Sequence, residues 1–539
     1  MNLQKKSNKK AYMQKAENMA VTGLLVCLLF VTAFLAISSI QRSYYPPMDG
    51  GTIFEVFDSA GKHILFLAGI GIGLSVFYFL FHKWEKYQEK IAGITLVVAA
   101  FWILATGMYY VHNHCYYPVG DQINTTAAAA YARQGNYLMF SKGGYIGMYE
   151  QQKGLVFLYE ILFSIFGDFC YDIVAKIHVL LSIVTLFAGY GFLKCVTANP
   201  FYRVLYNVLM VFCMPYMIYL PYAYGDLPSI CFCMVLFWAL ASYAKDWKKR
   251  YVIIGAVAAA LALMTRMNTW IVLIAVAIGM VLFAMNQRNI RPLLVGLCVI
   301  LVAAGSVKSV DAFYEYRSGL ESGVGIPAIL WIAMGLQKTD GNPGVYNRYQ
   351  QSVFADCNFE QEPAKEIGKQ YIKERLAEMK DDPEYTKDFF TKKVEMQWLE
   401  PLFESLIATE SFDEDKVVPG WLDSLYYGKL HDLIWKLSNY YQSVVYVALL
   451  GLVVTCFWTK RYSWQSVVAW IPLIAFLGGF LFSIMWENQC RYVMPYYVFM
   501  VMYAAVGLGR IAESVNAVIK RFAVKNSEAT KADVSSKVA

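Results

Sequence analysis

Residues 91–111 read IAGITLVVAAFWILATGMYYV and carry no charged side chain. An α-helix needs about 20 mostly apolar residues to cross the hydrocarbon core of a bilayer. Similar runs recur along the chain, at 18–40, 64–81, 204–225, 227–244, 437–459, 462–486 and 492–509. Of the 539 residues, 58% are hydrophobic and 16% are charged, whereas soluble domains average about 25% charged residues. The sequence therefore predicts an all-α polytopic membrane protein.

Positive charges gather at the N-terminus and in short connectors between the apolar runs. Five lysines lie within residues 1–15, and further basic residues lie in the connectors 82–90 and 245–250. Connectors rich in Lys and Arg stay on the cytoplasmic side, so both termini are expected in the cytoplasm, in a multi-pass protein of the cell (plasma) membrane. The net charge of +7 is explained by these segments. It indicates the lipid bilayer as a partner and no nucleic acid.

Alternating the apolar runs across the membrane predicts about 12 transmembrane helices, or 12–14 if one region hides more. That region contains three apolar stretches, at 154–167, 177–193 and 204–225. The residues on either side of it, Asp121 and Asp226, are both expected outside. An even number of crossings must join them, so one stretch is re-entrant, broken or a double crossing.

The same alternation divides the chain into five parts. Accessory spans occupy 1–90, and a membrane core occupies 91–310, with a first outer loop at 112–153. An extracytoplasmic, partly helical loop domain occupies 311–432. Within it Ala364, Tyr371 and Met379 recur at helical spacing, and Pro383 begins a second helical stretch. C-terminal spans occupy 433–510, and a cytoplasmic tail occupies 511–539.

A carboxylate follows the third apolar run at the point where that run leaves the bilayer. Gly120-Asp121-Gln122 precedes an alanine-rich stretch that ends at Gly135. Asp is favoured at helix starts because its oxygens accept hydrogen bonds from the unpaired backbone N–H groups. Taken alone, Asp121 is therefore explained as a helix cap, and a functional role needs support from other features.

The sequence that follows supplies such features. Residues 149–154 read YEQQKG and open the next apolar stretch, which ends in Phe-Gly at 166–167. Together with Asp121-Gln122 and Gly135, this order resembles the GT-C superfamily of membrane glycosyltransferases. The resemblance is to bacterial relatives of dolichyl-phosphate-mannose protein mannosyltransferases and aminoarabinose transferases. It differs in having QQKG where the family often has Lys-Pro-Pro, and two extra spans before Asp121. It makes 91–310 the GT-C-like catalytic membrane core.

Further elements fit the same resemblance. Asp226 follows Tyr-Gly on the predicted outer face, where the family has a second acidic residue, although a turn alone would also explain it. Arg266 and Asn268 lie in a connector between two spans. Arg491 lies in the segment ENQCRY, residues 487–492, at an outer span end. An Arg at a membrane edge can also serve only to anchor its helix by snorkelling.

The resemblance implies transfer of a sugar from a polyprenyl-phosphate-linked donor to an extracytoplasmic acceptor, which is a cell-envelope polymer, a lipid or a protein. Asp121 is implied as the general base that takes the proton from the acceptor hydroxyl. Cations must hold the departing phosphate, and Lys153, Arg266 and Arg491 are the candidates. The implied substrate-binding residues are Gln122, Glu150, Gln152, Lys153, Asp226, Arg266, Asn268, Glu487, Arg491 and Tyr492.

A metal ion is an optional part of this interpretation. In some members of the family both outer carboxylates help to bind metal, so a divalent metal held by Asp121 and Asp226 is an optional cofactor. A second candidate site is His112-x-His114-Cys115. Three ligands this close in sequence give strained geometry around one tetrahedral ion, which favours interfacial polar residues instead.

Two other functions are compatible with many spans and a large outer loop. An O-antigen-type polymerase or ligase relies on Arg and His in that loop, and 308–436 contains only His431 as histidine. A lipid or polysaccharide flippase needs charged residues along a cavity at the membrane midplane, whereas the charges here cluster at span ends. The sequence therefore favours the transferase.

Overall fold

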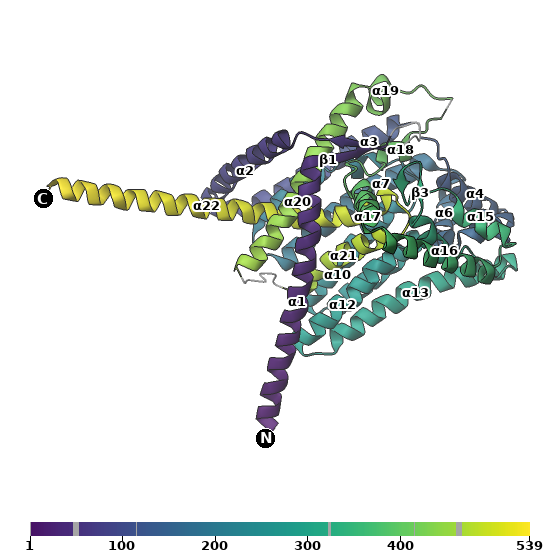
Figure 1. Cartoon of the computed structure of the whole chain (residues 1–539), viewed down its shortest axis with the longest axis horizontal. Helices are drawn as coiled ribbons and strands as arrows, with labels where there is room; N and C mark the ends of the chain where they lie inside the picture. The colour runs from purple at the N-terminus through teal and green to yellow at the C-terminus, as the bar shows by residue number, and fades with distance from the viewer. Residues whose placement is uncertain are drawn as a thin grey trace.

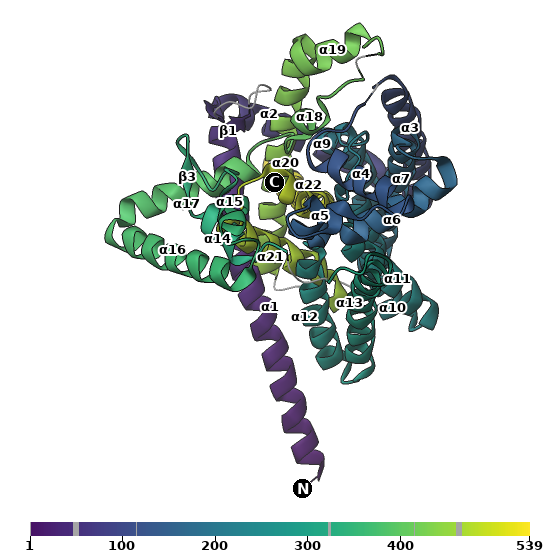
Figure 2. The same cartoon turned by 90° about the vertical axis from the view of Figure 1, so that its right-hand side faces the viewer.

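The computed structural model describes residues 2–46, 53–114, 116–321, 325–413, 415–459 and 466–538. These residues are mostly helical (Figures 1 and 2). The strands form two short antiparallel pairs, β1 (Arg42–Tyr45) with β2 (Phe54–Phe57), and β3 (Lys338–Thr339) with β4 (Asn342–Pro343). Ten helices of the described part are long and apolar enough to cross a membrane. The chain is therefore an all-α polytopic membrane protein.

The ten apolar helices form the body of the molecule. They are α1 (Asn2–Gln41), α2 (Ala60–Lys83), α3 (Gln88–Asn113), α7 (Tyr171–Val196), α10 (Asp226–Asp246), α12 (Thr269–Gln287), α13 (Arg291–Ser318), α20 (Lys429–Thr459), α21 (Ile471–Met485) and α22 (Met494–Val538). A short 3-10 turn, η4 (Val467–Trp470), leads into α21. Large apolar side chains such as Leu65 and Phe101 are exposed on their outer faces, as expected for helices surrounded by lipid.

Shorter helices lie between α3 and α12. They are α4 (Asp121–Arg133), α5 (Tyr145–Met148), α6 (Lys153–Phe166), α8 (Pro200–Val211), α9 (Met214–Ile218) and α11 (Lys249–Thr265), with the 3-10 turns η2 (Leu138–Phe140) and η3 (Glu150–Gln152). A further 3-10 turn, η1 (Glu85–Tyr87), comes directly before α3. Helix α6 packs along α4, and Arg133 at the end of α4 pairs with Asp168 just past α6. The 14 residues of α6 reach only about 21 Å, less than the hydrocarbon thickness.

The segment between α13 and α20 contains the helices predicted from the sequence. It consists of α14 (Ile329–Gly335), α15 (Tyr349–Asp356), α16 (Gln361–Asp381), α17 (Pro383–Trp398), α18 (Ser405–Thr409) and α19 (Gly420–Tyr427). On α16, Ala364 and Met379 are buried and Tyr371 is half-buried. Helix α13 continues to Ser318 and α20 begins at Lys429, so both overlap the ends of the predicted domain 311–432. We call α14–α19 with their connectors the loop domain.

The N-terminal helices pack against the C-terminal ones rather than forming a separate unit. Helix α1 lies along α20 and α2 lies along α22, and Figure 1 shows α1 and α22 projecting beyond the rest of the molecule. The carboxylate of Glu395 on α17 accepts hydrogen bonds from Ser38 at 3.0 Å and Tyr44 at 3.1 Å, and pairs with Arg42 at 3.4 Å. Residues 38–44 therefore fix one end of α17.

A second polar cluster ties α3, α8 and α22 together far from residue 121. Arg203 of α8 is buried and donates two hydrogen bonds to Glu89 of α3, at 2.6 and 3.0 Å. Tyr202 and Asn199 both donate to Glu513 of α22, at 2.8 and 2.7 Å. Glu89 lies in the first turn of the 26-residue α3, so this cluster lies about 35 Å along that helix from its other end.

Candidate active site

A cavity of about 790 Å³ opens where the ends of several helices meet. Its walls come from the start of α4, from residues 145–152, from the connectors α11–α12 and α21–α22, and from the loop domain. The sequence-predicted residues that line it are Asp121, Gln152, Arg266, Asn268, Glu487, Arg491 and Tyr492. Residues separated by hundreds of positions in the chain therefore meet in one place.

Asp121 is the first residue of α4, and its side chain is not used as a helix cap. Gly120 precedes it with φ of +58°, a left-handed conformation that favours glycine, and the helix start has no side-chain cap bond. The Asp121 Oδ1 atom accepts a hydrogen bond from Tyr145 at 2.9 Å, and Oδ2 lies 3.3 Å from Arg491 Nη2. The side chain is 40% exposed. The carboxylate is therefore held from both sides and still open to the cavity.

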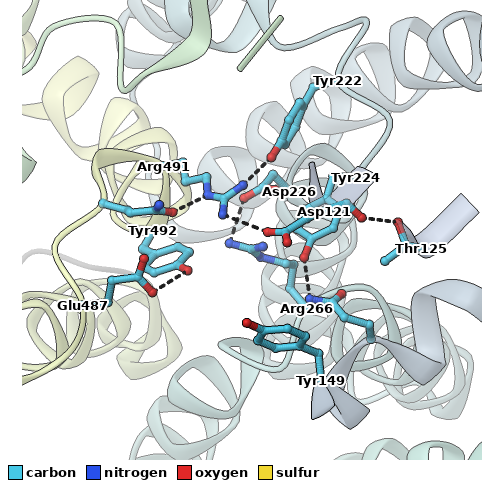
Figure 3. A network of polar contacts seen from close by, with 12 residues as sticks. Asp121, Thr125, Tyr149, Tyr222, Tyr224, Asp226, Arg266, Glu487, Arg491 and Tyr492 are labelled. Carbon is cyan, nitrogen blue, oxygen red and sulfur yellow. Dashed lines mark hydrogen bonds and ion pairs between the residues drawn. The ribbon is translucent and has the colours of Figure 1, made fainter. Parts of the chain in front are cut away.

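Arg491 connects several parts of the site (Figure 3). Its Nε donates to Gln489 at 2.7 Å, Nη2 donates to Asp121, and Nη1 donates to the hydroxyl of Tyr222. The side chain is 14% exposed. It lies in η5 (Cys490–Tyr492), between α21 and α22. A residue that only snorkelled would place its guanidinium in water or among headgroups, whereas this one is fixed by three side chains.

A second guanidinium lies beside the first. Arg266, in the connector between α11 and α12, pairs with Asp226 at 3.1 Å. Its guanidinium lies over the rings of Tyr224 and Tyr492, at 5.3 and 5.4 Å from their centres. Arg491 lies over the same two rings at 5.8 and 5.5 Å. Cation–π contacts of this kind contribute about 0.5–2 kcal/mol each, so the two tyrosines help to hold two like charges together.

Two glycines allow α11 to approach its neighbours closely enough to build the site. A Cβ at Gly225 would lie 2.0 Å from the carbonyl oxygen of Thr265, and one at Gly154 would lie 2.4 Å from that of Met264. Either contact would force the backbones apart. The first glycine brings Asp226 next to Arg266, and the second gives a physical reason for the sequence QQKG at this point.

Four predicted residues lie behind the cavity wall. The Gln122 oxygen accepts hydrogen bonds from the backbone N–H of Ala223, at 2.9 Å, and from Tyr116. Lys153 is buried and pairs with Glu150 at 3.0 Å. Asp226 is 1% exposed and faces Arg266. None of these four residues lines the cavity. Each can therefore affect the site only through the residues that it contacts.

Glu487 is the second carboxylate of the cavity wall. It is 3% exposed and accepts a hydrogen bond from Tyr492 at 3.2 Å. Burial raises the pKa of Glu487 to about 7, although the charge of Arg491 opposes the rise. The negative charges of Asp121 and Glu404 act in the same direction as burial. Glu487 therefore changes charge near neutral pH.

Several lining residues were not predicted from the sequence. Tyr145 and Tyr149 come from the segment before α6, and Tyr346, Arg348 and Gln350 come from the loop domain. Burial, together with the nearby charge of Asp121, raises the pKa of Tyr145, so its hydroxyl remains a donor. The only sequence signal for the first two was their place between Asp121 and the next apolar stretch, and the others carried none.

The described residues do not supply the ligand set of a metal site. In the ranges that the structure describes, no group of three or more His, Cys, Asp or Glu side chains is placed to hold an ion. Asp226 faces Arg266 rather than Asp121. His114 is buried, its ring nitrogen Nε2 lies 2.5 Å from the Tyr426 hydroxyl, and burial lowers its pKa to about 3. Cys115, the third residue of the other candidate metal site, lies outside the described residues.

The site combines a partly exposed carboxylate, two guanidiniums fixed by side-chain contacts, and several tyrosines. Such a set can accept a proton from a hydroxyl group and can stabilise a developing oxyanion. No protein-family model matches the chain, and no curated protein matches it. The chemistry of the site is therefore interpreted from its own geometry.

Proposed function

We propose that the protein is an integral membrane glycosyltransferase that moves a sugar from a polyprenyl-phosphate donor to a hydroxyl group of an extracytoplasmic acceptor. The observation that carries the proposal is the contact of Asp121 with Arg491 in a polar cavity at the ends of apolar helices. A lipid-linked donor places its phosphate at the bilayer surface, where span ends lie. A carboxylate beside an arginine at the outer ends of spans is also what the resemblance to GT-C enzymes implies, and it supports this function.

The reaction needs one base and one anion-holding group. Asp121 takes the proton from the acceptor hydroxyl, whose oxygen forms a bond to the anomeric carbon as the bond from that carbon to the phosphate oxygen breaks. The electron pair of the broken bond stays on the leaving polyprenyl phosphate. Tyr145 donates to Asp121 at 2.9 Å and orients the carboxylate.

Arg266 and Arg491 hold the donor phosphate in this proposal. Both line the cavity, and guanidiniums form paired hydrogen bonds with phosphate oxygens. Lys153 was an equal candidate by sequence, but it is 5% exposed and pairs with Glu150. Lys153 therefore lies behind the residues that line the cavity, and its positive charge acts on the donor phosphate without contacting it.

We further propose twelve crossings, with both termini in the cytoplasm of a cell-membrane protein. Helix α6 stays on the outer side along α4, because both begin near the cavity and end at the pair Arg133–Asp168. The broken pair α8–α9 crosses, because Tyr202 contacts Glu513, about 29 Å along α22 from its start, while Ala223 contacts Gln122 beside the cavity. With the 17-residue α11 and the ten long helices, this gives twelve.

Cysteine labelling tests the sidedness. Lys373 on α16 and Lys86 in η1 are both exposed. In a version without native cysteines, Lys373→Cys should react with a membrane-impermeant thiol reagent added to intact cells, and Lys86→Cys should react only after permeabilisation. The reason is that basic connectors remain inside. Labelling of Lys86→Cys in intact cells would overturn the topology and the extracytoplasmic site with it.

The donor KM should depend on pH through Glu487. A polyprenyl-phosphate sugar is a diester, which keeps one negative charge between pH 6 and 8. Because the pKa of Glu487 is about 7, this carboxyl is neutral below pH 7 and repels the donor above it. Two unit charges about 4 Å apart interact by about 1 kcal/mol in water and more strongly where protein excludes water, so donor KM should rise at least about fivefold from pH 6 to pH 8.

The matched variant is Glu487→Gln, which fixes the neutral form at every pH. Its donor KM should stay level over this range, close to the wild-type value at pH 6. A wild-type donor KM that does not change with pH, or a Glu487→Gln protein that retains the change, would remove Glu487 from the donor site.

A binding experiment tests the proposed function itself. Purified protein should bind undecaprenyl phosphate, the leaving group of such a donor, and should carry a polyprenyl phosphate detectable by mass spectrometry after purification. It should also release the sugar from a polyprenyl-phosphate donor in the presence of acceptor. Failure to bind the phosphate lipid at all would refute the transferase and leave the polymerase and flippase interpretations.

A further inference from the structure

We propose that the loop-domain wall of the cavity forms a separate subsite for an anionic acceptor that also bears hydroxyl or amide donors, with Arg348 as its anion-binding residue. This inference rests on the proposed function, because it assigns the acceptor class of the same cavity. It concerns a different wall from the one that holds Asp121, Arg266 and Arg491.

Among the described residues that line the cavity, Arg348 is the arginine that has no carboxylate partner. Arg266 and Arg491 each lie against a carboxylate, Asp226 and Asp121 respectively. Arg348 lines the same cavity and is exposed. Within the described residues its guanidinium makes no ion pair and no hydrogen bond. Its charge is therefore available to a ligand in the cavity.

The backbone at Arg348 is held in a conformation that an Arg rarely adopts. Its φ is +65° and its ψ is +7°, in the left-handed region just before α15, which is unfavourable for a residue with a Cβ. The preceding side chain stabilises the turn: Asn347 Oδ1 accepts from the N–H of Tyr349 at 3.0 Å, and its Nδ2 donates to Gln337 and Thr339. Backbone strain of this kind concentrates at functional sites.

A buried acceptor atom two residues after Arg348 in the chain supplies the second feature. Gln350 is 1% exposed and lines the cavity, and its Oε1 atom accepts no hydrogen bond from any described residue. A buried carbonyl oxygen without a donor is costly, so a ligand hydroxyl or N–H would satisfy it. An anion beside Arg348 and a donor beside Gln350 together describe one ligand, such as a sugar or polyol with a phosphate or carboxylate.

This wall is joined to the catalytic side by hydrogen bonds. Gln351 donates to the hydroxyl of Tyr149 and accepts from Tyr346 at 3.1 Å. Tyr149 belongs to the segment that precedes α6 and also lines the cavity. The proposed subsite thus faces the same space as Asp121, as an acceptor must if its hydroxyl is to give a proton to that carboxylate.

Soluble probes can separate this subsite from the donor site. Purified full-length protein is first saturated with undecaprenyl phosphate, which occupies the donor phosphate position. Binding of glycerol 3-phosphate and of glucuronate is then measured by calorimetry, with uncharged glucose as the control. The variant is Arg348→Asn, because Asn adopts left-handed backbone more readily than other residues with a Cβ. The matched control is Lys373→Gln, which removes one exposed charge from α16 of the same domain.

At least one anionic probe should bind the wild type, and glucose should bind far more weakly. Arg348→Asn should weaken that binding about ten- to hundredfold, the scale of a lost hydrogen bond to a charged group, while Lys373→Gln should bind like the wild type. The melting temperature of Arg348→Asn should not fall, since its backbone strain is relieved. The tighter of the two probes identifies the acceptor anion as phosphate or carboxylate.

Three results would overturn the subsite. The first is that neither anion binds, and the second is that Arg348→Asn binds the anionic probe as tightly as the wild type does. The third is that Arg348→Asn loses affinity for undecaprenyl phosphate by the same factor as for the anionic probe, which would assign Arg348 to the donor. The two proposals fail separately. If the wild type does not bind undecaprenyl phosphate but binds an anionic probe through Arg348, the transferase is refuted and the anion subsite stands.

Discussion

Asp121→Asn should lower the rate of sugar transfer by about 10²- to 10⁴-fold, the usual contribution of a positioned general base. An amide has almost the size of the carboxylate but cannot accept the hydroxyl proton. Donor binding should change much less, because Arg266 and Arg491 keep their positive charges. The measurement is steady-state transfer by purified protein, with donor and acceptor varied separately.

The structure separates this result from a loss of stability. The helix start has no cap bond from Asp121, so the cost of about 1 kcal/mol for a lost cap does not apply. Tyr145 can still donate to the amide oxygen, and Arg491 keeps its bonds to Gln489 and Tyr222. Expression and melting temperature of Asp121→Asn should therefore resemble the wild type.

A matched control is Asp388→Asn on α17, which removes an exposed carboxylate of the same outer region that does not line the cavity. Its transfer rate should equal that of the wild type. If Asp121→Asn also transfers sugar at the normal rate, the general base is another group. If instead it fails to fold, Asp121 has a structural role that its contacts do not indicate.

The sequence predicted the membrane class because lipid imposes one strong rule. Each span must be about 20 apolar residues long with its backbone bonds satisfied internally, and residues 91–111 satisfy that rule without any tertiary information. The stretch 154–167 does not reveal its path in the same way. Its position along α4 follows from the packing of the two helices against each other, which hydropathy cannot indicate.

The site residues at the ends of spans could be predicted from the sequence. Those whose position depends on tertiary contacts could not. Asp121, Arg266 and Arg491 stand at predicted outer ends of spans, so they could be proposed as neighbours. Arg348 lies within a polar loop segment whose distance from Asp121 no periodicity encodes. The burial of Lys153 could not be predicted from the sequence either, since it follows from the close contact of the next residue, Gly154, with the backbone of Met264.

Arg491→Gln should lower kcat/KM for the donor by about 10²- to 10³-fold, the scale for removing one group that stabilises developing negative charge. The leaving phosphate gains charge as its bond to the sugar breaks, so the lost cation affects the transition state at least as much as the ground state. In addition Asp121 loses its partner at 3.3 Å. Both effects act on catalysis, so kcat should fall as well as donor affinity.

Arg491→Lys should restore only part of the activity. An ammonium keeps the charge, but it cannot contact Gln489, Tyr222 and Asp121 at once through a planar fork. The matched control is Arg133→Gln, which removes an outer Arg from its pair with Asp168, away from the cavity, and should leave donor kinetics unchanged. Full activity in Arg491→Lys with an unmoved donor KM in Arg491→Gln would mean that this Arg only anchors its helix. The donor phosphate would then depend on Arg266 alone.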